Sequence, residues 1–445
     1  MTTTMTRFFS LGVLVMVLAL NAWPVGAASQ RAQAPVTIRV STWDTGNAGL
    51  KPYQVGIKAF EAANPGIKVD IESISNPMSP GLSFYLARVL AEIASGNAPD
   101  VILVPDDNAR TFAHSGRLLD LGPVLKKGGV KLSDFYTNVW NIGNLSGTTY
   151  YVPKDWADLS VFYNKTMFQK AGLPFPKAGW TWADFLRDAR ALTIVKNGHP
   201  VQWGANVGNG GLWLRAGLEY FVGAAGGHIL NPQGTSTTGY LTSPVTEKAI
   251  EYFLNLYTRY HISPTPAIVS GFGTLDLFNA QKVAMSFWGP WPLVGVYEAN
   301  PQLNFGVAPM PIGPRGKPVT EPFWAGYGIY KGSKHLSAAE KFVVWSASRQ
   351  WATIDARWSM PAFKDVAVTV SMKRDPNLTA FFQQAPYVIP EEETKTINFD
   401  DDVAAPLQHM IDVAISGGSS VNVPRLIAQT SAQINAKLAA TYKNQ

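Results

Sequence analysis

The chain has 445 residues, of which 46% are hydrophobic and 15% charged, and its formal net charge is +6. This length is too great for one ordinary core and predicts roughly two or three domains. The basic residues form no run longer than pairs such as Lys126-Lys127, which argues against a nucleic-acid-binding protein. Because cysteine is absent, we expect no disulfide, thiol catalysis, zinc–thiolate site or lipid anchor on a cysteine.

The N-terminal residues 1–28 are predicted to be a cleavable signal peptide. Arg7 precedes the apolar run 8–22, and residues 23–28 offer small side chains for cleavage. The run is too short and too weakly flanked for a stable membrane span, and no later stretch reaches the roughly 18 apolar residues required. We therefore expect a soluble protein exported to the periplasm.

The next part of the chain alternates predicted strands and helices. Residues 36–43 and 67–74 alternate apolar and polar side chains, as half-buried strands do. Residues 101–104 are all apolar, which is typical of a strand buried on both faces. Strands separated by helices predict an α/β fold with a parallel, doubly wound sheet.

Ligands of such sheets bind beyond the carboxyl ends of the strands. Trp43 and Asp44 follow the first strand, and Asp106, Asp107 and Asn108 follow the 101–104 strand. These residues are therefore candidates for a binding site. The alternative for Asp107 and Asn108 is a helix N-cap, since either side chain can accept from free backbone N–H groups.

The segment 151–165 suggests a crossing between two sheets. It begins extended, becomes polar at 154–158 and resumes as a second apolar run at 159–163. Pro153 cannot donate a ladder hydrogen bond, so it favours a strand edge or end. A cleft between two lobes would lie at this crossing, whereas the alternative is an ordinary surface loop between neighbouring strands.

The second half continues the mixed pattern. Thr181 with Asp184, and Ser337 with Glu340, predict capping boxes, and Ser243 followed by Pro244 predicts a helix start. Residues 282–288 read as a strand, and the chain is expected to return to the first lobe near 321–328. From about 376 onward three helical pieces are predicted.

Several of these motifs together resemble the family 1 extracellular solute-binding proteins, the maltose-binding-protein-like receptors of ATP-binding-cassette (ABC) importers. The similarity keeps its order over most of the mature chain. The motifs that carry it lie at residues 60–69, 98–101, 115–121, 162–165, 179–185 and 289–291.

The resemblance implies an α/β, two-lobed periplasmic-binding-protein fold in which each lobe is a doubly wound sheet flanked by helices. Hinge crossings would join the lobes near 154–158 and 320–328, and a third crossing near 365–376 is left open. The implied lobe 1 comprises 36–154 plus 326–370. The implied lobe 2 comprises 155–320 plus 376–440.

The resemblance also implies a sugar or similar polar solute in the cleft. Sugar rings present C–H faces that lie on aromatic rings, while their hydroxyl groups need acceptors and donors such as carboxylates and amides. The candidate ligand-binding residues on these grounds are Trp43, Asp44, Asp107, Asn108, Asp155, Trp156, Asp158, Trp213, Trp291, Trp324, Arg357 and Trp358.

Each candidate has a structural alternative. A tryptophan such as Trp213 or Trp291 can simply pack its own helix, and Asp155 or Asp158 can be a solvated hinge charge. Val104-Pro105 stands where some sugar-binding members place an aromatic platform, which puts a long oligosaccharide in question. A phosphorylated or acidic sugar derivative, or a glycerol phosphate, remains an alternative ligand because of the basic residues Lys154, Arg215 and Arg357.

Catalytic motifs are lacking. The sequence has no His-Glu-x-x-His metal motif and no Gly-x-Ser-x-Gly nucleophile elbow. The acidic stretches 391–393 and 400–402 could supply paired carboxylates for glycoside hydrolysis, although a solvated face is the simpler interpretation. The rival to a receptor is thus a secreted carbohydrate-active enzyme. We expect a monomeric receptor without cofactor or metal, whose partners are a small polar solute and the permease subunits of an ABC importer, with no nucleic acid.

Overall fold

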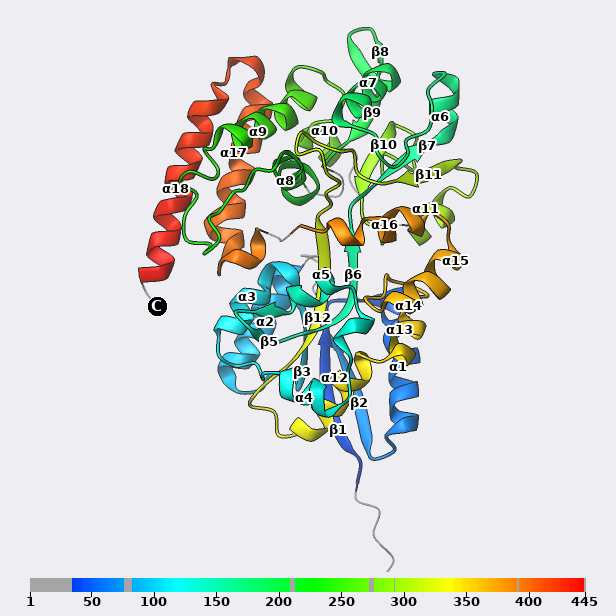
Figure 1. The fold of residues 1–445 in the computed structure, drawn as a ribbon, viewed down its shortest axis with the longest axis vertical. Helices are drawn as coiled ribbons and strands as arrows, with labels where there is room; N and C mark the ends of the chain where they lie inside the picture. The colour runs from blue at the N-terminus through cyan, green and yellow to red at the C-terminus, as the bar shows by residue number, and fades with distance from the viewer. Residues whose placement is uncertain are drawn as a thin grey trace, which may run out of the picture.

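The computed structural model describes residues 34–75, 82–208, 213–271, 276–291, 293–389 and 392–443. The predicted signal peptide, 1–28, lies outside these residues. Figure 1 shows two bodies, one above the other, each built on a sheet with helices around it. We call the lower body, which contains the N-terminal strand, lobe 1 and the upper body lobe 2. The two-lobed α/β architecture expected from the sequence is therefore observed.

The sheet of lobe 1 has five strands in the order β2-β1-β3-β12-β6. β1 pairs in parallel with β2 and with β3, as the strand–helix alternation predicts. β12 runs antiparallel to both β3 and β6. The strands are β1 (Val36–Thr42), β2 (Ile67–Ser73), β3 (Val101–Pro105), β6 (Val152–Asp158) and β12 (Pro322–Ile329).

The sheet of lobe 2 has five strands in the order β11-β7-β10-β9-β8. Only β9 and β10 are parallel, and the other pairs are antiparallel. Both sheets are thus mixed: the strand that enters from the other lobe, β12 in lobe 1 and β7 in lobe 2, runs antiparallel to both of its neighbours. The strands are β7 (Ser160–Asn164), β8 (Ile194–Lys196), β9 (His199–Asn206), β10 (Val283–Trp288) and β11 (Phe305–Ala308); β4 (Asn144–Leu145) and β5 (Thr148–Thr149) form a small separate hairpin.

Helices cover both sheets, and their starts follow local capping chemistry. Thr181 and Asp184 form the predicted capping box, and Ser243 accepts from the backbone N–H of Thr246 at the start of α9. The capping box predicted at Ser337 is wrong, because α12 already starts at Leu336, after His335, which makes no side-chain cap. The helices are α1 (Gly46–Ala63), α2 (Leu82–Ser95), α3 (Ala109–His114), α4 (Gly122–Lys127), α5 (Thr137–Ile142), α6 (Lys165–Lys170), α7 (Trp182–Leu192), α8 (Tyr220–Ala225), α9 (Pro244–Thr258), α10 (Pro266–Gly271), α11 (Leu293–Ala299), α12 (Leu336–Ser346), α13 (Arg349–Asp355), α14 (Lys364–Val366), α15 (Met372–Arg374), α16 (Leu378–Gln384), α17 (Ala405–Gly417) and α18 (Val423–Lys443).

The chain changes sheet between β6 and β7, at the end of the range 154–158 expected for the first crossing. Leu159, which joins the two strands, donates its N–H to Thr320 Oγ1 at 3.0 Å and accepts from Gln384 Nε2 at 2.9 Å. Thr320 in turn forms a parallel bridge with Val388. Three segments therefore run side by side between the lobes, and the third lies later in the chain than 365–376.

Helix α16 packs against both lobes (Figure 1). The ring of Phe382 contacts that of Trp156 in lobe 1, with centroids 6.2 Å apart. The neighbouring Phe381 contacts Phe162 in lobe 2, with centroids 6.1 Å apart. The apolar core of lobe 1 is thus continuous through this helix with part of lobe 2.

Candidate functional site

A cleft of about 1080 Å³ lies between the lobes. Lobe 1 contributes the end of β1, the turn after β3, part of β6 and the segment after α13, while lobe 2 contributes Arg215 and the segment around α11. Residues 374–376, at the end of α15, also line the cleft and contact both lobes. The carboxyl ends of β1 and β3 both open into it, as the rule for parallel strands predicts.

On the lobe 1 side, Asp44 is held in place by hydroxyl groups. Its Oδ2 atom accepts from the hydroxyl of Tyr53, on α1, at 2.5 Å, and from Thr42 Oγ1 at 3.2 Å. Trp43, half-buried beside it, meets the ring of Tyr85 edge-on with centroids 5.4 Å apart. The first strand therefore presents an oriented carboxylate next to an indole ring.

The floor of the cleft contains a buried lysine between two aspartates. Lys154 Nζ lies 2.5 Å from Asp155 Oδ2, 3.9 Å from Asp355 Oδ1 and 5.4 Å from the centre of the Tyr53 ring. Burial alone would lower the pKa of Lys154, but the surrounding negative charges, led by Asp155, keep that pKa well above its ordinary value. The lysine is therefore a fixed positive charge at the floor.

Burial raises the pKa of Asp355 to about 6, and the charge of Lys154 offsets this only in part. An unfolded aspartate has a pKa of about 3.9, so the folded chain holds this proton more tightly. The resulting contribution to stability is full below about pH 4 and is lost as the pH rises through about 6.

In the parent protein, Asp355 should make the free energy of unfolding fall as the pH rises from about 4 to 7. We expect this fall to be smaller in Asp355→Asn. Urea denaturation across this range measures the slope. Asp365→Asn, which removes an aspartate that is 51% exposed, is the control and should leave the slope unchanged. An unchanged slope in Asp355→Asn would show that this carboxyl group does not titrate as described.

Arg215 connects the two lobes at the back of the cleft. It comes from the π-helical turn Trp213–Glu219 of lobe 2 and binds both carboxylate oxygens of Asp106 in lobe 1, at 3.1 and 2.9 Å. Its Nε atom lies 2.9 Å from Glu393 Oε1, and its guanidinium carbon lies 4.0 Å from the centre of the Phe323 ring. Asp106 also accepts from the N–H of Trp324 at 2.7 Å.

The lobe 2 side presents aromatic rings. Trp291 is 47% exposed, and its ring meets Phe323 edge-on with centroids 5.0 Å apart. Tyr297 donates to Asp375 Oδ2 at 3.0 Å. Across the cleft, Trp358 is half-buried after α13. The cleft therefore combines partly exposed indole rings with anchored carboxylates.

A model of the bacterial extracellular solute-binding proteins matches residues 44–353. The chain belongs to this family. Among curated relatives, a putative binding protein of Brucella abortus is 25% identical over 68% of this solute-binding protein and 71% of its own length. A maltooligosaccharide ABC transporter solute-binding lipoprotein of Streptococcus pneumoniae is 24% identical over 83% of this chain and 82% of its own length.

Solved structures share the fold of this solute-binding protein. An ABC substrate-binding protein of Listeria monocytogenes in complex with cycloalternan superposes with a TM-score of 0.76 at 24% identity, covering 91% of this chain and 99% of the other. A Mycobacterium tuberculosis protein in complex with glycerophosphocholine gives a TM-score of 0.72 at 19% identity, covering 92% and 100%.

Most of the residues proposed from the sequence line the cleft of this solute-binding protein. Two of them, Trp156 and Trp324, are only 2% and 4% exposed, so their rings belong to the interior. Trp156 donates its indole N–H to the carbonyl of Pro361 at 3.2 Å. The predicted residues that line the cleft are Trp43, Asp44, Asp155, Trp156, Trp291, Trp324, Arg357 and Trp358.

The structure does not place Asn108 and Asp158 in the cleft. Asn108 ends a tight turn after β3 and hydrogen-bonds Asp400, because the turn carries the chain away after Asp106. Asp158, fully buried at the end of β6, has carboxylate oxygens without a hydrogen-bond partner among the described residues, and burial raises its pKa. The side chains of Asp107 and Trp213 lie outside the described part of the structure.

Asp106, which the strand-end rule singles out together with Asp107, lines the cleft. Several other cleft residues carry no such signal in the sequence. Tyr53, Asp355, Tyr297 and Asp375 come from or next to helices, and nothing in their local pattern separates them from other helix-face residues. Their role depends on how distant helices are packed around the cleft.

Two further properties concern only the described residues. No cluster of three or more histidine, aspartate or glutamate side chains there could hold a metal ion. No helix there is both long and apolar enough to cross a membrane.

Proposed function

We propose that this protein is the substrate-binding component of an ABC importer. It binds a sugar or a related polar solute in the interlobe cleft and delivers it to the permease after hinge closure. The three segments that run side by side between the lobes provide the joint about which closure occurs. The ligand favours the closed state because only that state brings both walls of the cleft into contact with it.

The observation that carries this proposal is the pairing of indole rings with oriented carboxylates across the cleft. Trp43 and Asp44 come from lobe 1, and Trp291 comes from lobe 2. Indole rings suit the C–H faces of a sugar, and carboxylates accept from its hydroxyl groups. Relatives named for maltooligosaccharide and cycloalternan give independent support for a carbohydrate.

A second candidate ligand is a solute with a phosphate or carboxylate group. Arg357 is exposed at the cleft and makes no ion pair with another described residue. A free guanidinium group can bind such an anion through two parallel hydrogen bonds. One structural relative was solved in complex with glycerophosphocholine, which carries a phosphate group, so glycerol phosphates are the anionic solutes to test first.

The proposed partners and location follow from the same role. The chain would act in the periplasm as a monomer after removal of residues 1–28, and it would dock on the membrane permease in its closed form. Some relatives are named as lipoproteins, whereas this sequence has no cysteine to carry a lipid.

A carbohydrate-active enzyme has less support. Of the acidic stretches considered for hydrolysis, Glu392 pairs with Lys395 at 2.6 Å and Glu393 with Arg215 at 2.9 Å. Neither residue lines the cleft. Incubation with a glycan panel separates the two functions, because product formation would favour the enzyme and intact glycan with a melting shift would favour the receptor.

The correct ligand is expected to raise the free energy of unfolding by about 2.7 kcal/mol at a hundredfold excess over its dissociation constant. A thermal-shift screen of sugars, polyols and glycerol phosphates measures this, and a change in tryptophan fluorescence should accompany the hit. Arg357→Gln separates the two ligand classes, because it should weaken binding of an anionic solute and leave a neutral sugar nearly unaffected. A screen in which no small polar solute shifts the melting temperature would contradict the proposed function.

A further inference from the structure

A second cavity of about 340 Å³ lies within lobe 2, beside the segments that cross between the lobes. It shares no lining residue with the interlobe cleft. Val319 and Val388 form part of its wall next to the Thr320–Val388 bridge, and Val222 and Ile229 form apolar wall elsewhere. Its size is that of a small-molecule site, for which roughly 300 Å³ is the lower end.

Two buried glutamates form one end of this cavity. Glu219 and Glu321 are each 2% exposed, and both carboxylate oxygens of Glu219 lack a hydrogen-bond partner among the described residues. Gly223 follows Glu219 by one helical turn, so the two share a helix face. Glu321 Oε1 lies 3.6 Å from the position that a Cβ atom would take on Gly223, which places both carboxylates over that face.

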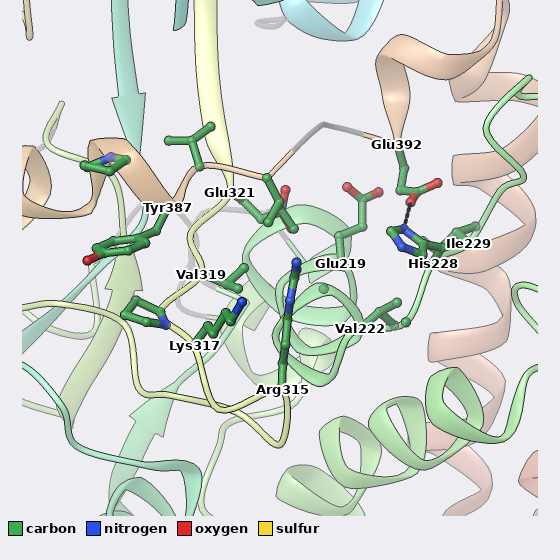
Figure 2. Close-up of a pocket in the computed structure, with 16 residues that line it drawn as sticks. Glu219, Val222, His228, Ile229, Arg315, Lys317, Val319, Glu321, Tyr387 and Glu392 are labelled. Atoms are coloured by element: carbon green, nitrogen blue, oxygen red, sulfur yellow. Dashed lines mark ion pairs between the residues drawn. The ribbon is translucent and has the colours of Figure 1, made fainter. Parts of the chain in front are cut away.

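Basic side chains reach the same cavity from an exposed loop. Arg315 and Lys317 are exposed on the loop that precedes Val319, and Figure 2 shows their side chains extending toward the cavity from that loop, while Glu219 rises from its helix between Glu321 and Glu392. Among the side chains drawn, the marked ion pair joins His228 to Glu392, at 3.5 Å, and leaves Arg315 and Lys317 unpaired.

An unpaired buried carboxylate is costly, so the protein gains when a positive charge reaches Glu219. Burial, the largest cause, raises the pKa of Glu219 well above its ordinary value; Glu393, Glu321 and Glu392 raise it further, and Arg215 lowers it. A bare metal ion fits poorly, because much of the wall is apolar and Arg315 and Lys317 add positive charge. An organic ammonium group on a short apolar stem fits both the acidic end and the walls.

We propose that this cavity is a second binding site, which takes a small zwitterion of the amino-acid type. Glu219 and Glu321 bind its ammonium group, the apolar walls contact its carbon chain, and Arg315 and Lys317 face its carboxylate. Charge-assisted hydrogen bonds at the buried end supply most of the affinity. The site is separate from the solute cleft and does not depend on the identity of the solute.

Three probes of equal chain length test this assignment by calorimetry and thermal shift: 6-aminohexanoate, hexylamine and hexanoate. We expect 6-aminohexanoate to bind, hexylamine to bind more weakly and hexanoate not to bind. Glu219→Gln should weaken 6-aminohexanoate binding by roughly tenfold or more, because a charge-assisted hydrogen bond is lost. Burial raises the pKa of Glu219 and so favours its neutral form. The neutral amide of Glu219→Gln should therefore be tolerated at the same place, and the variant is expected to fold about as stably as the parent.

Arg315→Gln, a change on the exposed loop, should weaken the binding of 6-aminohexanoate and leave the binding of hexylamine unaffected. This variant tests the proposal even if Glu219→Gln does not fold. Asp412→Asn, on the exposed face of α17, is the matched control for loss of one negative charge in lobe 2. Trp291→Ala, in the cleft, should leave 6-aminohexanoate binding intact and so separates the two sites. No binding of 6-aminohexanoate, equal binding of hexanoate, or unchanged affinity in Glu219→Gln would overturn the proposal.

Discussion

Replacing Arg215 with Ala is expected to lower the free energy of unfolding by about 3–5 kcal/mol, because it leaves buried carboxylates without their cation. Arg215 is 13% exposed, while Asp106 and Glu393, its two carboxylate partners, are 5% and 2% exposed. The variant also loses the contact between the guanidinium group and the ring of Phe323.

The same change should loosen the two lobes relative to each other, since Arg215 lies in lobe 2 and Asp106 in lobe 1. Urea denaturation followed by circular dichroism measures the stability, and small-angle scattering measures the change in shape. Arg215→Lys keeps the charge but cannot bind both oxygens of Asp106 side by side, so it should fall between the parent and Arg215→Ala.

Arg349→Ala provides the control. Arg349 pairs with Asp365 at 2.7 Å, and the two side chains are 57% and 51% exposed. Exposed ion pairs contribute at most about 1 kcal/mol, so the control should be nearly as stable as the parent. Equal losses in Arg349→Ala and Arg215→Ala would mean that burial of the interlobe pair has no special effect.

The elements that the sequence predicted are those with a strong local signal. The alternation in β1, the continuous apolar run of β3 and the capping box at Thr181 each depend on a few neighbouring residues. The antiparallel strand β12 could not be placed in the lobe 1 sheet this way, because its partners β3 and β6 are far away in the chain. The direction of β12 depends on the return of the chain from lobe 2 to lobe 1, and no local sequence pattern encodes that return.

The candidate site shows the same limit for single side chains. Trp156 and Trp324 are direct cross-strand partners on β6 and β12, so their rings point to one face of the sheet. That face is interior, and the ring of Trp324 fills space over Gly326 and Gly143, where a Cβ atom would lie 2.2 Å and 3.3 Å from it. From the sequence alone, a tryptophan on a strand cannot be told from one that stacks on a ligand. Only the pairing of the strands in the folded sheet shows which face its ring occupies.

Trp291→Ala is expected to weaken solute binding by about 2 kcal/mol, or roughly thirtyfold, the loss typical of an aromatic residue central to a binding surface. The ring is 47% exposed at the cleft and rests against Phe323, so the free protein should lose little stability, about 0.5 kcal/mol or less. Titration of the hit from the thermal-shift screen, followed by calorimetry, measures the affinity.

Two further variants show whether the position of the Trp291 ring matters as well as its presence. Phe175→Ala removes a ring that is 39% exposed elsewhere in lobe 2 and should leave the affinity unchanged. Gly289→Ala keeps Trp291 but would place a Cβ atom 1.8 Å from its Cζ3, so the ring must move. Affinity lost in both Trp291→Ala and Gly289→Ala, with stability retained, would assign the solute to this wall of the cleft. Parent-like affinity in Trp291→Ala would instead mean that the solute binds without contact to lobe 2 at this point.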